Sequence, residues 1–202
     1  MTDLGLAYRV LDLCAGAGGK TLAIAAQMKN KGRILAFDVN AYRMQDLKKR
    51  CARAGVDNVQ AHVLSSETDP FLKRHIETAD RVLVDAPCTG TGTWRRNPDL
   101  KWKTGRAQLA EIQALQRRIL QSAARLVKPG GRLIYATCSV LKDENSEQLA
   151  WFLTQHPQFG VVSAAEVWNK NFPLPVSAAG DVQLTPHQDG TDGFYAAVLV
   201  KI

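Results

Sequence analysis

The 202-residue sequence has no apolar run long enough to cross a bilayer, because its longest apolar stretches have the length of single strands. Its first residues lack the basic segment and the long apolar segment of a secretory signal. We therefore expect a soluble, cytoplasmic protein. With 46% hydrophobic and 22% charged residues, the chain can build a buried core, and its length suits one domain over residues 1–202.

Cysteine and histidine pairs with metal-ligand spacing are also missing. The four cysteines (Cys14, Cys51, Cys88, Cys138) form no C-x-x-C pair, and the four histidines are equally dispersed. We expect no metal site and no disulfide framework, and free thiols suit a reducing compartment. The net charge of +7 favours an anionic partner such as nucleic acid, although a merely basic surface would give the same value.

Strand-like and helix-like segments alternate along the chain. The predicted strands are Arg9–Cys14, Arg33–Val39, Val59–Leu64, Arg81–Ala86, Arg132–Thr137, Gly160–Ala164 and Phe194–Ile202. The predicted helices are Lys20–Met28, Tyr42–Ala54, Ala107–Val127 and Asn145–His156. Pro129-Gly130-Gly131 should stop the longest helix, and Asn171–Gly193 should form a long loop. This alternation predicts an α/β fold with a mostly parallel sheet covered on both faces.

A glycine-rich turn, Asp12-Leu13-Cys14-Ala15-Gly16-Ala17-Gly18-Gly19-Lys20-Thr21, joins the first strand to the first helix. A P-loop would need glycine in place of Cys14, and a dinucleotide fingerprint would need glycine in place of Thr21. What remains is backbone that can approach an anionic ligand group at a helix N-terminus. Asp38 ends the next strand, where a carboxylate can accept hydrogen bonds from ribose hydroxyls. Alternatively, the glycines only form a tight turn and Asp38 only caps a helix.

Two cysteines follow two further strands. Cys88 lies in the turn Asp85-Ala86-Pro87-Cys88-Thr89-Gly90-Thr91-Gly92, and Cys138 lies in Thr137-Cys138-Ser139. In a doubly wound sheet, ligands bind beyond the carboxyl ends of the strands. Both cysteines and Asp85 should therefore face the same crevice as the glycine turn, rather than serve as small buried hydrophobes.

These segments, together with Arg95–Trp102 and Thr191–Tyr195, resemble motifs of the RsmB/NOP2/Sun family of RNA cytosine-5 methyltransferases. The resemblance runs from about Val10 to the C-terminus. It implies a class I methyltransferase fold, a Rossmann-like three-layer sandwich whose seven-stranded, mostly parallel sheet has an antiparallel last strand. It also implies S-adenosyl-L-methionine as cofactor and RNA as partner. The cofactor-binding residues would be Cys14, Ala15, Gly16, Ala17, Gly18, Gly19, Lys20, Asp38, Arg43 and Asp85.

By the same resemblance Cys138 is the nucleophile, Cys88 assists product release, and Asp85 and Lys20 complete the catalytic group. A nucleophile is needed because C5 of cytosine is unreactive until a thiolate has added to C6. A free thiol has a pKa near ~8.5, so Cys138 needs a positive field or a base, and Lys20 is the nearest plausible charge.

A basic, aromatic segment, Trp94–Arg106, follows the Cys88 turn directly. Its cations are expected to hold RNA phosphates while a flipped base enters the pocket, although an isolated charge run of this kind would be a solvated face. The predicted RNA-binding residues are Arg95, Arg96, Lys101, Lys103 and Arg106.

The chain departs from the family in three places. Ala17 stands where the first motif usually has proline. Ser66 and Glu67 stand where an acidic residue near the adenine is usual, and the sequence does not decide between them. We also expect the chain to lack the N-terminal RNA-binding region usual in the family. We expect a monomer acting on RNA, with rRNA favoured and tRNA as the alternative. A DNA methyltransferase, or a cofactor-binding and RNA-binding module with little activity of its own, are competing interpretations.

Overall fold

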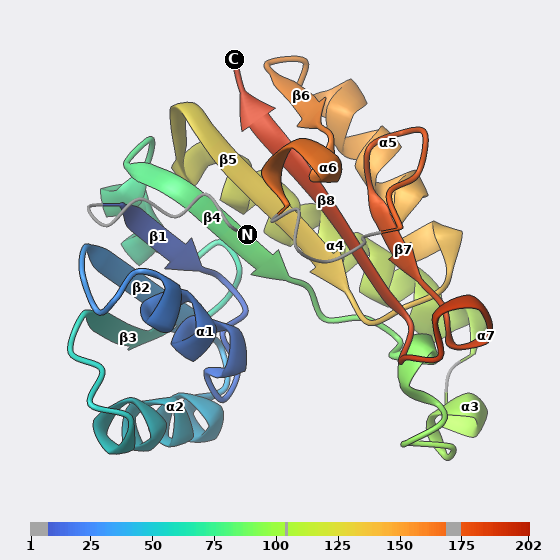
Figure 1. The fold of residues 1–202 in the computed structure, drawn as a ribbon, viewed down its shortest axis with the longest axis horizontal. Coiled ribbons are helices and arrows are strands. Elements are labelled where there is room, and N and C mark those ends of the chain that lie inside the picture. The colour runs from blue at the N-terminus through green and yellow to red at the C-terminus, as the bar shows by residue number, and fades with distance from the viewer. Residues whose placement is uncertain (1–7, 104, 169–174) are drawn as a thin grey trace.

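The computed structural model describes residues 8–103, 105–168 and 175–202 (Figure 1). The strands are β1 (Arg9–Asp12), β2 (Arg33–Asp38), β3 (Val59–Val63), β4 (Ala79–Asp85), β5 (Val127–Thr137), β6 (Phe159–Val162), β7 (Val182–Leu184) and β8 (Phe194–Lys201). The α-helices are α1 (Gly19–Gln27), α2 (Ala41–Arg53), α3 (Leu100–Lys103), α4 (Arg106–Leu126), α5 (Ser146–Gln155), α6 (Ala164–Val167) and α7 (Pro186–Asp189). Short 3-10 helices are η1 (Pro70–His75), η2 (Thr91–Thr93) and η3 (Lys142–Glu144).

The strands form one sheet in the order β3-β2-β1-β4-β5-β8-β6, and β7 pairs with β8 beside β6. Strands β1 to β5 are parallel to one another, and β8 runs antiparallel to β5, β6 and β7. The mostly parallel sheet with an antiparallel last strand is therefore confirmed. Within the described residues it has eight strands rather than seven, because β7 adds a short pairing to β8.

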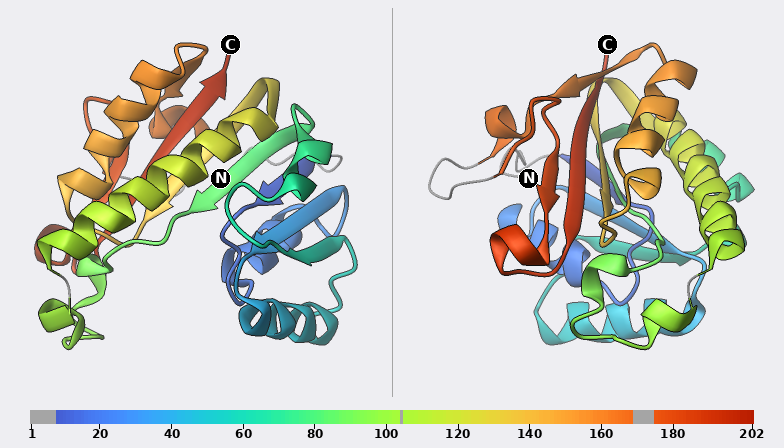
Figure 2. Two further views of the ribbon diagram at one scale, coloured as in Figure 1. Left: turned by 180° about the vertical axis from the view of Figure 1, so that it is seen from behind. Right: turned by 90° about the vertical axis from the view of Figure 1, so that its right-hand side faces the viewer.

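Helices cover both faces of the sheet, and Figure 2 shows α4 and α5 crossing one of them. The main core lies on that face, where Leu120 of α4 and Phe152 of α5 pack with Val84 of β4. On the opposite face, Ile24 of α1 and Met44 of α2 belong to two smaller buried clusters. The central strands are apolar throughout because both of their faces are buried. The predicted three-layer arrangement is thus confirmed.

Two local predictions were wrong. Helix α4 ends at Leu126 and β5 begins at Val127, so Pro129-Gly130-Gly131 lies inside a strand rather than ending the helix. The register to β4 shifts there, which accommodates a proline that has no N–H to donate. The predicted loop Asn171–Gly193 contains β7 and α7 within its described part, and residues 171–174 lie outside the described residues.

Candidate active site

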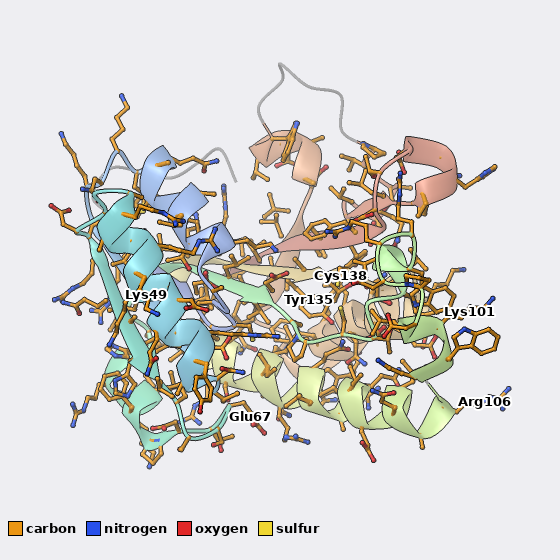
Figure 3. All side chains as sticks on the ribbon, turned by 90° about the horizontal axis from the view of Figure 1, so that it is seen from below. Lys49, Glu67, Lys101, Arg106, Tyr135 and Cys138 are labelled. Atoms are coloured by element: carbon orange, nitrogen blue, oxygen red, sulfur yellow. The ribbon has the colours of Figure 1, made fainter. Side chains whose placement is uncertain are left out.

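A cleft of about 1000 Å³ opens at the carboxyl ends of the parallel strands. The four predicted catalytic residues, Lys20, Asp85, Cys88 and Cys138, all line it. The predicted cofactor residues line it too, with the exception of Gly18. Strands from both halves of the chain meet here, which is where ligands bind in doubly wound sheets. Figure 3 shows Cys138 toward the middle of the view, whereas Lys101 and Arg106 lie at its edge.

The glycine turn and Asp38 form one hydrogen-bonded unit. Gly16 N donates to Asp38 Oδ2 at 2.8 Å, and Asn40 N donates to Asp38 Oδ1 at 2.8 Å. Gly18 has φ 85°, and a Cβ there would lie 2.8 Å from Leu47 Cγ. Only glycine fits this position without displacing α2, so Gly18 supports the turn from behind while its neighbours face the cleft.

Below the turn, Asp12 is fully buried at the end of β1 and accepts a 2.7 Å hydrogen bond from Thr21 Oγ1. Burial raises the pKa of Asp12 to about 7, against the lowering effect of the Thr21 hydrogen bond. The bond ties β1 to the first turn of α1 across the glycines. Sequence reasoning did not assign a role to Asp12, and its only signal was a carboxylate inside an otherwise apolar strand.

Cys88 and Cys138 lie at the ends of the adjacent strands β4 and β5, and their Sγ atoms are 3.2 Å apart. Both thiols are free and partly buried. A hydrogen bond from the Cys88 thiol is the largest influence on Cys138 and lowers the pKa of Cys138 to about 7, against desolvation and the charge of Asp85, which raise it. The same contact and burial raise the pKa of Cys88. These opposite shifts favour Cys138 as the thiolate of the pair, with Cys88 as the donor.

Lys20 of α1 and Asp85 of β4 form an ion pair, with Lys20 Nζ 2.6 Å from Asp85 Oδ2. The Lys20 ammonium also lies 5.6 Å from the centroid of the Phe194 ring. The structure thus brings Lys20 to the cysteines, but its charge is largely balanced by Asp85. Its lowering effect on the pKa of Cys138 is smaller than that of the Cys88 hydrogen bond. The neighbouring thiol, which sequence reasoning did not consider for this role, is the largest influence that lowers the pKa of Cys138.

Close backbone packing holds the Cys138 turn in place. Gly92 N donates to Cys138 O at 2.9 Å, and Gly193 N donates to Gly92 O at 2.8 Å. A Cβ on Gly92 would lie 2.5 Å from Gly193 O and 2.7 Å from Cys138 O. The glycine of the Cys88 turn and the segment before β8 are therefore both needed to form this three-part contact.

The predicted RNA-binding residues lie outside the cleft lining, on the segment that leads through α3 into α4. Lys101 and Arg106 project from the edge of the molecule, well away from Lys49 on α2 (Figure 3). Arg96 pairs with Asp192, and Arg95 Nη1 donates to Gly190 O at 2.8 Å. These contacts tie the basic segment to the loop before β8. RNA binding by this segment stays a prediction.

Of the two residues left open for the adenine, Glu67 lines the cleft and forms an ion pair with Arg118 of α4. The Ser66 hydroxyl lies 3.2 Å from that of Thr68. The geometry thus favours Glu67 as the residue that faces a ligand, and its pairing with Arg118 lowers its pKa.

The family model described as 16S rRNA methyltransferase RsmB/F matches residues 6–200. The chain belongs to the RsmB/F methyltransferase family. It is 41% identical over 202 residues to ribosomal RNA small subunit methyltransferase B of Pasteurella multocida, covering 96% of this chain and 42% of that protein. It is 36% identical over 192 residues to the probable ribosomal RNA small subunit methyltransferase B of Bacillus subtilis, covering 95% of this chain and 43% of that protein. The chain therefore spans about two fifths of the length of these relatives.

Solved structures agree with the RsmB/F assignment. NSun6 from Pyrococcus horikoshii, solved with SFG, has a TM-score of 0.84 at 26% identity, over 99% of this chain and 49% of that one. A methyltransferase homolog protein from Pyrococcus horikoshii has a TM-score of 0.82 at 30% identity, over 100% of this chain and 64% of that one. The class I methyltransferase fold and the family resemblance are confirmed. The prediction of S-adenosyl-L-methionine as cofactor is confirmed by the family, whose members are S-adenosylmethionine-dependent methyltransferases.

The described residues contain no candidate for a membrane-spanning helix and none for a metal site. None of the helices in those ranges is both long and apolar enough to cross a membrane. Likewise, the described His, Cys, Asp and Glu side chains form no group of three that could hold a metal ion.

Proposed function

We propose that this chain is the catalytic domain of an enzyme that methylates C5 of cytosine in ribosomal RNA through a covalent adduct on Cys138. The observation that carries the proposal is the 3.2 Å contact between two thiols at the ends of β4 and β5, inside the cleft that the glycine turn and Asp38 also line. A paired thiolate and thiol suit a reaction that adds a sulfur nucleophile to a ring and later removes it.

The residues present fit the cofactor. Backbone N–H groups hold both carboxylate oxygens of Asp38 in place, where they can accept hydrogen bonds from the ribose hydroxyls of the cofactor. The N-terminus of α1 can bind the carboxylate group of the cofactor. A Cβ added to Gly19 would meet no other atom within 4 Å, so the backbone here is open to a ligand. When bound, S-adenosyl-L-methionine supplies an electrophilic methyl group to the activated C5.

The chain's own residues then have distinct tasks. Cys138 attacks C6 of the base as a thiolate, which places electron density on C5 and the pyrimidine edge. Asp85, with Oδ2 held by Lys20, can accept from the exocyclic amino group, and Lys20 can donate toward the ring as charge develops there. After transfer, a base takes the C5 proton, and the electron pair of the C5–H bond reforms the C5–C6 double bond as the C6–S bond breaks and the Cys138 thiolate leaves. Cys88 donates its hydrogen bond to that departing sulfur.

An adduct experiment tests the roles of the two thiols. Each protein is incubated with a 16S rRNA fragment and S-adenosyl-L-methionine, and the products are run on a denaturing gel. Cys138→Ala should give neither adduct nor methylated cytosine. Cys88→Ala should trap RNA on Cys138, because release is slowed. Cys51→Ala, a matched change at a cysteine on α2 outside the cleft lining, should behave like the unchanged protein.

If Cys88→Ala formed no adduct while Cys138→Ala did, the roles would be reversed and Cys88 would be the nucleophile. If no variant bound or modified RNA while S-adenosyl-L-methionine still bound, the chain would be a cofactor-binding module. Methylation of tRNA but not rRNA would favour the alternative substrate. We further propose that the domain acts as a monomer in the cytoplasm, which sedimentation and cell fractionation can check.

A further inference from the structure

Glu144, the last residue of η3, is a fully buried carboxylate outside the cleft lining. Its oxygens accept from Thr89 N at 2.9 Å and from Thr89 Oγ1 at 2.5 Å. Gln116 Nε2 of α4 donates to Glu144 Oε1 at 3.0 Å and also to Pro87 O at 3.0 Å. Of the two chain neighbours of Cys88, Thr89 is therefore held by Glu144 directly, and Pro87 is held through Gln116.

Asn145 performs the same task for the other thiol. Its Oδ1 accepts from Thr137 Oγ1 at 2.6 Å, and its Nδ2 donates to Ser139 O at 2.9 Å. Both chain neighbours of Cys138 are thus held by one amide. Asn145 directly precedes α5, where asparagine ordinarily caps the helix, yet its side chain makes no capping bond. The helix gives up a stabilising contact so that the amide can reach the Cys138 turn.

The charge of Glu144 adds a second effect. A buried carboxylate is costly, and in this case the donors that satisfy it are neutral amide and hydroxyl groups. A neutral side chain could anchor the turn at lower cost. The contact with Cys138 and burial are the main causes that raise the pKa of Cys88, and the negative charge of Glu144 adds to them. It thereby helps to keep that thiol protonated and able to donate to Cys138.

We propose that Glu144 and Asn145 are positioning residues that clamp the two cysteine turns together, so that Cys88 donates to Cys138 and Cys138 is the reactive thiolate. The proposal rests on the proposed function, in which Cys138 is the nucleophile. The charged and titratable groups that face Cys138 are Cys88 and Asp85 from the β4 end and Lys20 from α1, and Glu144 acts on it through Cys88.

The test is the pH profile of Cys138 alkylation by iodoacetamide, resolved by peptide mass spectrometry and measured without RNA or cofactor. Because no methylation is needed, the result does not depend on whether the proposed function holds. Glu144→Gln and Asn145→Ala should each raise the inflection of the Cys138 alkylation profile by ~0.5–1 pH unit. A shift of this size is expected when the geometry of a charged hydrogen bond loosens and part of its free energy is lost. Glu147→Gln, the same change at an exposed position of α5, should leave it unchanged.

A double variant separates positioning from general loosening. In a Cys88→Ala background, Glu144→Gln should add no further shift, because the donor through which it acts is gone. If Glu144→Gln does not fold, Thr89→Val carries the test, since it removes only one donor to Glu144 and keeps the side-chain shape. An unchanged inflection in a folded Glu144→Gln or Thr89→Val protein, or an equal shift with and without Cys88, would overturn the proposal.

Discussion

Replacing Cys88 by alanine should change the acidity of Cys138 by an amount that the structure sets. The Cys88 thiol lies 3.2 Å from Cys138 Sγ, and in the proposed arrangement it donates to that sulfur. A hydrogen bond to a charged group is worth ~1.5–3 kcal/mol. Because Cys138 is partly exposed and solvent weakens the interaction, we take a value at the low end of this range, about 1.4 kcal/mol. That corresponds to about one pKa unit. The alkylation inflection of Cys138 should therefore rise from about 7 to roughly one unit higher in Cys88→Ala.

The rates add a second signature. A thiolate becomes more nucleophilic as its pKa rises, with a Brønsted slope of about 0.4–0.5, so the plateau rate at high pH should increase by roughly threefold. Below pH ~7 the variant should react more slowly, because less of it is ionised, and the two curves should cross between about pH 7 and pH 8.

Peptide-resolved alkylation of the folded proteins gives both quantities. Cys88→Ser keeps a hydroxyl donor and should retain most of the low inflection, which makes it the matched control. Wider access to the cleft would scale the rate at every pH but would not move the inflection. An inflection in Cys88→Ala equal to that of the unchanged protein would show that Cys88 does not stabilise the thiolate.

Three further outcomes are expected. Asp38→Ala should weaken S-adenosyl-L-methionine binding by ~1–2 kcal/mol or more in calorimetry, and an unchanged affinity would refute the assigned contact. Because burial raises the pKa of Asp12 from 3.8 to about 7, the folded chain holds a proton that the unfolded chain has lost, so the free energy of unfolding should fall as the pH rises through that interval. The free energy of unfolding of Asp12→Asn, measured by urea denaturation, should lack this decline. The same pH dependence in the variant and the unchanged protein would contradict the prediction. The isolated chain should bind RNA weakly, with Lys101→Ala or Arg106→Ala each reducing the salt slope by ~0.7; steep, tight binding unaffected by either change would show that the phosphate contacts lie elsewhere.

The parts of the site that could be predicted from the sequence are local in the chain. The glycine turn, Asp38, Asp85 and the two cysteines each follow an apolar strand, and parallel strands end at one edge of a sheet. Their meeting in one cleft follows from that topology alone.

What could not be predicted are the side-chain partners that come from distant segments. Asn145 precedes a helix, so its sequence position indicates a cap, and only the fold shows that it reaches Thr137 and Ser139 instead. Lys20 was expected to act on Cys138 directly, but its pairing with Asp85 depends on where α1 meets β4. The strand β7 was missed because three residues beside glycine and proline carry too little periodicity to be recognised.

Strand β8 links distant segments of the chain to the cysteine turns. It pairs with β5, β6 and β7, and Gly193, just before it, donates to the backbone of Gly92 beside the Cys138 carbonyl. Contacts between segments so far apart in sequence form slowly, since a long loop must close first. We therefore expect the cysteine turns to reach their final packing late in refolding, so that the pKa of Cys138 departs from that of a free thiol in step with the docking of β8.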